Sequence, residues 1–132
     1  MSGAKSRRKG HDFEREFCRW VRDEFGIAFG RNLKQYSEAQ NGDTDPLGPF
    51  LPECKAYAKP NPQGWWPQAV AQAERAGLVP LLVVKIPRKG WIAYMPLDFL
   101  VKGGAGEWRK DWKYTVPVFP EGLAYIVREN LG

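Results

Sequence analysis

The stretch WWPQAVAQAERAGLVPLLVVKI, residues 65–86, predicts a helix that leads directly into a buried strand. Its first part places Pro67 in the first helical turn and ends at Gly77, a typical helix stop. Its second part, residues 79–86, is a continuous apolar and β-branched run, the signature of a strand covered on both faces. The stretch therefore favours an α/β fold, with helices on both sides of a sheet.

The flanking residues extend this pattern to an α/β sandwich around a mixed β-sheet. HDFEREFCRWVRDEF, residues 11–25, has the apolar spacing of an amphipathic helix, which we expect to end at Gly26. The other expected strands and short helices lie at residues 27–36, 50–57, 91–95, 96–104, 112–119 and 121–130. Residues 1–132 are expected to form one domain, with residues 1–10 as a flexible basic arm.

The chain is basic, with 20 Lys and Arg against 15 Asp and Glu and a pI of about 9.3. This excess makes a polyanion, nucleic acid above all, the first partner to consider. The positive residues gather in four clusters: Lys5, Arg7, Arg8 and Lys9; Arg31 and Lys34; Lys85, Arg88 and Lys89; Arg109, Lys110 and Lys113. The last cluster interleaves with aromatic residues, and we favour its interpretation as a solvated face over a partly buried aromatic strand.

Several other classes of protein are disfavoured by the composition. No apolar run approaches the ~18 residues that a membrane span requires, and the N-terminus lacks the apolar segment of a secretory signal. The two cysteines, Cys18 and Cys54, form no CxxC motif, so neither a disulfide framework nor a structural zinc site is indicated. These features predict a reduced cytoplasmic protein without a membrane partner.

NGDTDPLGPFLPECK, residues 41–55, gathers three carboxylates and a lysine in this basic chain. Because side chains alternate along a strand, Glu53 and Lys55 should share one face, and Asp43 and Asp45 should likewise share one. The turn signals at 46–49 allow the two segments to pair as a hairpin, which would bring one Asp, Glu53 and Lys55 together. Oxygen ligands suit Mg²⁺, and a lysine beside them could orient or deprotonate a water, so the set matches metal-assisted phosphodiester hydrolysis. Alone, an ExK triplet is most often a solvent-facing ion pair.

Glu14 adds weight to the hydrolytic interpretation. On the helical projection it falls within the apolar stripe formed by Phe13, Phe17, Val21 and Phe25. A carboxylate turned toward a core is costly unless it is paired or liganded, and such groups tend to be functional.

Three blocks of the chain, taken in order, resemble the archaeal and phage Holliday-junction resolvases of the PD-(D/E)xK, or restriction-endonuclease-like, nucleases. The blocks are RKGHDFEREF (8–17), GD with ECK (42–43 and 53–55), and GWWPQAVAQAERAGLVPLLVVK (64–85), and the resemblance covers about residues 7–95. It implies a restriction-endonuclease-like core in α-β-β-β-α-β order. It also implies a homodimeric endonuclease that resolves four-way DNA junctions in recombination, in the host-cell cytoplasm if a phage encodes it.

The resemblance also implies roles for individual residues. Glu14 would assist the metal or water, Asp43 and Glu53 would bind the metal with the carbonyl of Cys54, and Lys55 would be the catalytic lysine. The implied metal is Mg²⁺, with Mn²⁺ as a substitute. Together with the charge clusters, the resemblance places the nucleic-acid contacts at Arg7, Arg8, Lys9, Arg31, Lys34, Ser37 and Gln68.

Two departures from the family pattern leave alternatives open. The gap from Asp43 to Glu53 is shorter than usual, and Asp45 is a competing ligand, although the Gly-Asp pairing favours Asp43. Pro52 removes a ladder donor, which predicts a sheet edge or a bulge. The alternative functions are a nuclease of the same fold that acts on duplexes or their ends, and a non-catalytic DNA-binding module.

Overall fold

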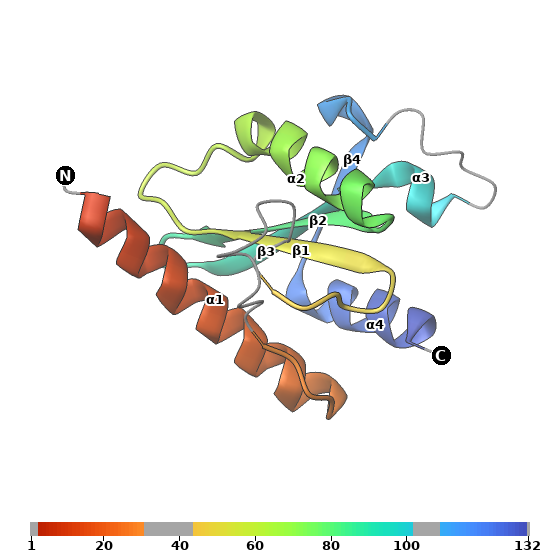
Figure 1. The fold of residues 1–132 in the computed structure, drawn as a ribbon, viewed down its shortest axis with the longest axis horizontal. Coiled ribbons are helices and arrows are strands. Elements are labelled where there is room, and N and C mark those ends of the chain that lie inside the picture. The colour runs from red at the N-terminus through yellow and green to blue at the C-terminus, as the bar shows by residue number, and fades with distance from the viewer. Residues whose placement is uncertain (1–2, 31–43, 102–108, 132) are drawn as a thin grey trace.

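The computed structural model describes residues 3–30, 44–101 and 109–131. The elements are α1 (Gly3–Phe25), β1 (Phe50–Lys55), α2 (Pro62–Ala76), β2 (Val79–Ile86), β3 (Gly90–Pro96), α3 (Leu97–Leu100), a 3₁₀ turn (Trp112–Tyr114), β4 (Thr115–Val118) and α4 (Pro120–Asn130). The strands form one sheet in the order β1-β2-β3-β4, with β1 parallel to β2 and the other neighbours antiparallel. The predicted mixed sheet flanked by helices is confirmed, with α2 on one face and α1 and α4 on the other (Figure 1).

The strand β2 is buried on both faces, as its sequence predicts. Leu81 and Val83 pack in the core under α1 and α4, whereas Leu82 and Val84 pack with Trp66 of α2. The alternation of side chains along a strand thus divides one apolar run between two hydrophobic layers. The strand β2 therefore contributes side chains to both hydrophobic layers.

The helix α2 ends where the sequence predicts and begins three residues earlier than expected. Gly77 adopts the left-handed conformation with φ 69°, and its N–H donates to the carbonyls of Ala73 and Glu74. At the other end, the Asn61 side chain accepts a hydrogen bond of 3.2 Å from the Gly64 N–H. Small residues on the buried face, Ala69 and Ala73, let the helix lie close to the sheet.

The edge position predicted from Pro52 is also confirmed, because β1 is the first strand of the sheet. An edge strand can contain a proline because the backbone N–H groups on its open side need no hydrogen bond to a neighbouring strand. The strand that carries Glu53 and Lys55 is therefore open on one side within the described part of the chain.

Three expectations differ from the structure. First, α1 begins at Gly3 rather than at His11, so it includes residues 3–10 of the expected arm. Second, residues 27–30 form no strand. Third, the expected hairpin is reduced in the described residues to one antiparallel bridge, Leu47 to Phe50, closed by hydrogen bonds of 2.8 and 2.9 Å. The described residues therefore contain one strand between the first two long helices.

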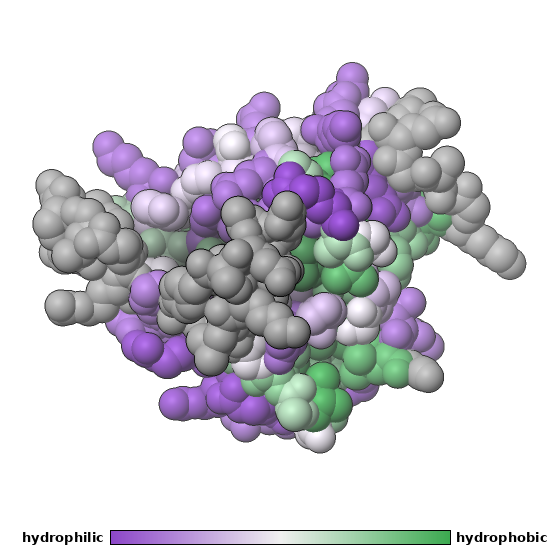
Figure 2. Space-filling model, in the orientation of Figure 1, coloured by the Kyte–Doolittle hydropathy of each residue, from purple (hydrophilic) through white to green (hydrophobic). Residues whose placement is uncertain are grey.

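The surface of the molecule is mixed in character. Figure 2 shows mainly hydrophilic residues over α2 and apolar residues over α4. Leu131, which follows α4 in the chain, is exposed. None of the helices in the described ranges combines the length and apolar character that a bilayer span requires.

Candidate active site

The pair Glu53 and Lys55 lies on the face of β1 that looks toward α2. Glu53 is in register with Leu82, which packs under α2, whereas Phe50 and Cys54 point into the core below α1. The Lys55 Nζ is 3.7 Å from the Glu53 Oε1, and the two side chains are 17% and 5% exposed. The predicted shared face is confirmed, and the burial distinguishes this ExK triplet from a solvent-facing ion pair.

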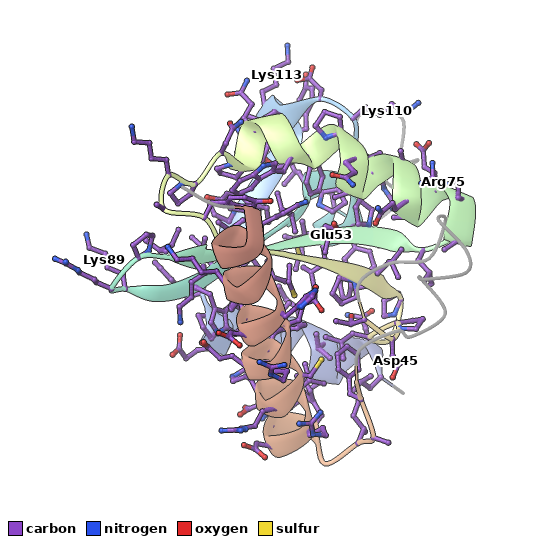
Figure 3. The ribbon with its side chains drawn as sticks, turned by 60° about the vertical axis from the view of Figure 1, so that its left-hand side comes forward. Asp45, Glu53, Arg75, Lys89, Lys110 and Lys113 are labelled. Carbon is purple, nitrogen blue, oxygen red and sulfur yellow. The ribbon has the colours of Figure 1, made fainter. Side chains whose placement is uncertain are left out.

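Glu14 is buried, as the helical projection predicts. Its exposure is 7%, and Phe13, Phe17 and Cys18 around it are buried as well. The helix α1 packs against β1, the strand that carries Glu53 (Figure 3). A buried carboxylate on a helix next to this strand is the arrangement expected of a functional acid.

Asp45 has a different environment. Its Oδ2 accepts a hydrogen bond of 3.0 Å from the Gly30 N–H, and its own N–H donates to the Gly30 carbonyl at 2.9 Å. Figure 3 places the exposed Asp45 well away from Glu53. Asp45 therefore ties the segment before β1 to the segment after α1. Asp43, the favoured metal ligand, lies outside the described residues, so that assignment stays a prediction.

The thiol of Cys18 reports on the charges along this flank of α1. Burial raises its pKa to about 11, Arg22 acts in the opposite direction, and the negative charges of Glu14 and Asp45 raise it further. The carboxylates of Glu14 and Asp45 thus both raise the pKa of Cys18, which lies one helical turn after Glu14. A thiol with a raised pKa is a poor nucleophile at neutral pH, so Cys18 is a core residue.

The predicted nucleic-acid contacts lie in several parts of the chain. Lys9 is exposed on α1, and Gln68 is exposed on α2. Arg7 and Arg8 belong to α1, but their side chains are outside the described set. Arg31, Lys34 and Ser37 lie outside the described residues. The structure therefore locates Lys9 and Gln68 on the surface, and all seven nucleic-acid contacts remain predictions.

Gln72 is a polar residue that the sequence did not single out. Its Oε1 is buried and accepts no hydrogen bond within the described part of the chain. It follows Gln68 by one helical turn, on the flank of α2 that carries Trp65, and Trp65 contacts Tyr57 just beyond β1. The signal that could have found it is the repeat of glutamine at the i and i+4 positions among alanines.

The basic aromatic segment near the C-terminus is occupied by internal contacts. Arg109, Lys110 and Lys113 pair with Asp98, Glu74 and Asp111 at 3.0, 3.8 and 3.7 Å. The ring of Trp112 is half-buried and lies 5.0 Å from that of Tyr94. These contacts match the favoured interpretation of a solvated face over partly buried aromatic rings.

The donor chemistry of the buried acids suits a hard divalent cation. Mg²⁺ commonly takes one or two carboxylates and keeps several waters, and Glu14 and Glu53 supply carboxylates at low exposure. Within the described ranges, no group of three or more His, Cys, Asp or Glu residues could hold a metal ion. The third predicted ligand, Asp43, is not among these residues.

Comparison with known proteins identifies the family of the chain. No curated protein sequence is significantly similar to the chain. Residues 5–116 match the model of a family described as "Phage putative PDDEXK endonuclease". The matched span contains Glu14, the Glu53–Lys55 pair and the core from β1 through β3. The chain therefore belongs to the phage PDDEXK endonuclease family.

Proposed function

We propose that this protein is a metal-dependent, structure-selective DNA endonuclease that resolves four-way junctions by phosphodiester hydrolysis. The observation that supports this proposal most directly is the buried Glu53–Lys55 pair, whose charged atoms lie 3.7 Å apart on an edge strand. An acid and a lysine kept side by side at low exposure bear a desolvation cost, and groups held at such a cost tend to be functional. Membership of a phage endonuclease family supports the cleavage of a phosphodiester bond as the reaction.

In this proposal the acids hold the cation and the lysine acts on the water. Glu53, Asp43 and the carbonyl of Cys54 would bind Mg²⁺, for which Mn²⁺ would substitute, and Glu14 would assist from α1. When bound, the ion polarises the phosphoryl group and lowers the pKa of a water ligand. The Lys55 ammonium orients the attacking water and offsets the negative charge that develops in the transition state.

The proposed substrate and assembly follow from charge and symmetry. The net charge of +5 favours binding to DNA phosphates, and Arg7, Arg8, Lys9, Arg31, Lys34, Ser37 and Gln68 are the proposed contacts. A four-way junction offers two equivalent strands, so a homodimer with two sites related by a dyad would cut both. The phage family makes the cytoplasm of the infected cell the proposed place of action.

Cleavage of a four-way junction and of a linear duplex with the same arms tests this function. With Mg²⁺, the wild type should cut the junction and leave the duplex intact, and without the metal it should cut neither. Glu53→Gln and Asp43→Asn should lose junction cleavage, whereas Asp45→Asn should retain it. Equal cleavage of the linear duplex would contradict junction resolution. Full activity of Glu53→Gln would contradict the catalytic site itself.

A further inference from the structure

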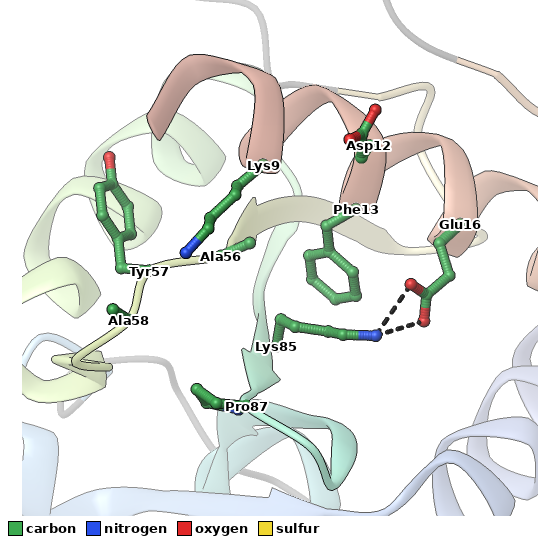
Figure 4. A pocket seen from close by; sticks show the side chains of 9 residues that line it. All are labelled: Lys9, Asp12, Phe13, Glu16, Ala56, Tyr57, Ala58, Lys85 and Pro87. Carbon is green, nitrogen blue, oxygen red and sulfur yellow. Dashed lines mark hydrogen bonds and ion pairs between the residues drawn. The ribbon is translucent and has the colours of Figure 1, made fainter. Parts of the chain in front are cut away.

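A pocket of about 380 Å³ opens between the first half of α1 and the residues that follow β1 and β2 (Figure 4). Its walls are largely apolar and are formed by Phe13, Ala56, Tyr57, Ala58 and Pro87. Tyr57 is 41% exposed, and its ring contacts Trp65 with 5.1 Å between the ring centroids. The pocket thus has an accessible aromatic ring that is already held in place by a second ring.

Four charged side chains border the pocket, and three of them are neutralised. The Lys85 Nζ binds both carboxylate oxygens of Glu16 at 2.9 and 3.0 Å, and Asp12 is paired with Arg15. Lys85 also lies over the Phe13 ring, 5.8 Å from its centroid, so it forms part of the wall. Within the described residues Lys9 has no ion pair, and Figure 4 shows it reaching from α1 toward Ala56. Among the described residues, the charge of Lys9 is therefore the one at the pocket without an ion-pair partner.

The pocket begins where the candidate catalytic strand ends. Ala56 follows Lys55 directly, and an extended chain advances about 3.3 Å per residue. The wall from Ala56 to Ala58 therefore starts within one residue of the lysine. On α1, the pocket uses the flank of Lys9 and Phe13, whereas Glu14 faces the other flank.

We propose that this pocket binds one unpaired nucleotide of the DNA strand next to the scissile phosphate, an assignment that rests on the nuclease function proposed above. The base lies against Tyr57 and the apolar wall, and its phosphate contacts Lys9. Each base has a flat π-face, which suits an exposed aromatic ring. A pocket of this size excludes a double helix, and a lone phosphate would meet one free ammonium and mostly apolar walls. An unpaired base enters most readily because little stacking or pairing is lost.

Binding of a bulged duplex, measured without divalent metal so that no strand is cut, tests the pocket. The bulge is a single 2-aminopurine nucleotide, whose fluorescence reports stacking, and a fully paired duplex of the same length is the reference. The wild type should bind the bulged duplex more tightly by roughly 5- to 100-fold, the range expected for one base stacked on an aromatic ring. The 2-aminopurine fluorescence should be quenched on binding.

Two variants alter the pocket in different ways. Tyr57→Ala removes the ring, and Ala58→Leu fills the space while keeping Tyr57. Both should bring the ratio of the two dissociation constants close to 1. Ala76→Leu is the matched control, because Ala76 is exposed at the opposite end of the sheet, where α2 turns into β2. It should keep the wild-type ratio.

The outcomes separate the pocket from the nuclease. A wild-type ratio near 1, or a ratio that Ala58→Leu leaves unchanged, would overturn the pocket assignment even if the protein cuts junctions. Conversely, a protein that cuts no DNA but shows the bulge preference and its loss in both variants would support the pocket and contradict the proposed catalysis.

Discussion

Glu53 illustrates how one residue links burial to activity. Its carboxylate is almost fully buried, and the ammonium of Lys55 lies 3.7 Å away. The surface pair Glu74 and Lys110 has nearly the same separation, 3.8 Å, but its side chains are 50% and 73% exposed. Water screens the surface pair, whereas the buried pair bears the cost of desolvation. The two pairs are therefore matched in chemistry and different in environment.

Glu53→Gln and Glu74→Gln test this difference. Glu53→Gln keeps the side-chain volume but leaves the Lys55 ammonium at low exposure without its anionic partner, so the free energy of unfolding should fall by at least ~1 kcal/mol while DNA cleavage falls by at least ~100-fold. Glu74→Gln should leave the free energy of unfolding within about 0.5 kcal/mol of wild type and cleavage unchanged. Urea unfolding and a cleavage assay measure both. A gain of stability in Glu53→Gln would show that the Glu53 charge does not stabilise the buried Lys55 ammonium.

The raised pKa of Cys18 gives a second prediction at this scale. Because the folded protein holds the thiol proton more tightly than the usual pKa of 9.0 implies, this contribution to stability is fully present below pH 9. It is lost as the pH rises toward about 11. Glu14→Gln removes a charge that raises this pKa, so the thiolate should form at lower pH. Alkylation rates against pH in a Cys54→Ala background measure the shift, and an unchanged or higher pKa would contradict an ionised Glu14.

At the scale of the elements, local signals predicted most of the fold. The strand over 79–86 and the helix ending at Gly77 were correct because a β-branched run and a left-handed glycine act within a few residues. Residues 27–30 were wrongly expected to begin a strand. Phe29 instead packs on Phe17, with 6.3 Å between the ring centroids, and its carbonyl accepts a 2.7 Å hydrogen bond from Arg22. The apolar side chains of residues 27–30 thus pack against α1 and do not form a strand.

In the candidate site, too, the features that depend on local sequence patterns were predictable, and those that depend on long-range contacts were not. Strand alternation placed Glu53 beside Lys55, and the helical projection turned Glu14 inward, because both rules are local. The contact between Asp45 and Gly30 spans 15 residues, so no local pattern could predict it. For Gln72, the repeat of glutamine at i and i+4 is a local signal, but the burial of its Oε1 depends on the packing of α2 over β1.

The C-terminal end of α2 offers a prediction for a whole element. Gly77 has a φ of 69°, and a Cβ added there would meet nothing within 4 Å. Gly77→Ala should therefore lower the free energy of unfolding by about 1 kcal/mol through backbone strain alone. Gly10→Ala is the control, because Gly10 lies inside α1 without a positive φ and with open space around it. It should raise stability by about 0.5–1 kcal/mol. Equal effects of the two changes in urea unfolding would contradict the cap.

At the scale of the whole molecule, the edge position of β1 decides what can approach the site. The sheet order leaves β1 without a partner strand on one side in the described residues, while α1 and α2 cover its two faces. Glu14 comes from one of these helices, and Gln68 and Gln72 come from the other. In the proposed function, this edge, open within the described residues, is the side from which a DNA backbone would approach Glu53 and Lys55.

The charge of the whole molecule predicts how DNA binding depends on salt. Each phosphate that a lysine or arginine neutralises releases counterions, so the logarithm of the binding constant should fall linearly with the logarithm of the salt concentration. Lys9 has no ion pair in the described part of the chain, and Lys9→Gln should reduce the magnitude of this slope by about 1. Lys113 is paired with Asp111 in the solvated C-terminal segment, so Lys113→Gln should leave the slope unchanged. Fluorescence anisotropy of a labelled junction at several salt concentrations measures both slopes. If Lys113→Gln lowers the slope and Lys9→Gln does not, DNA lies along the C-terminal segment and not along α1.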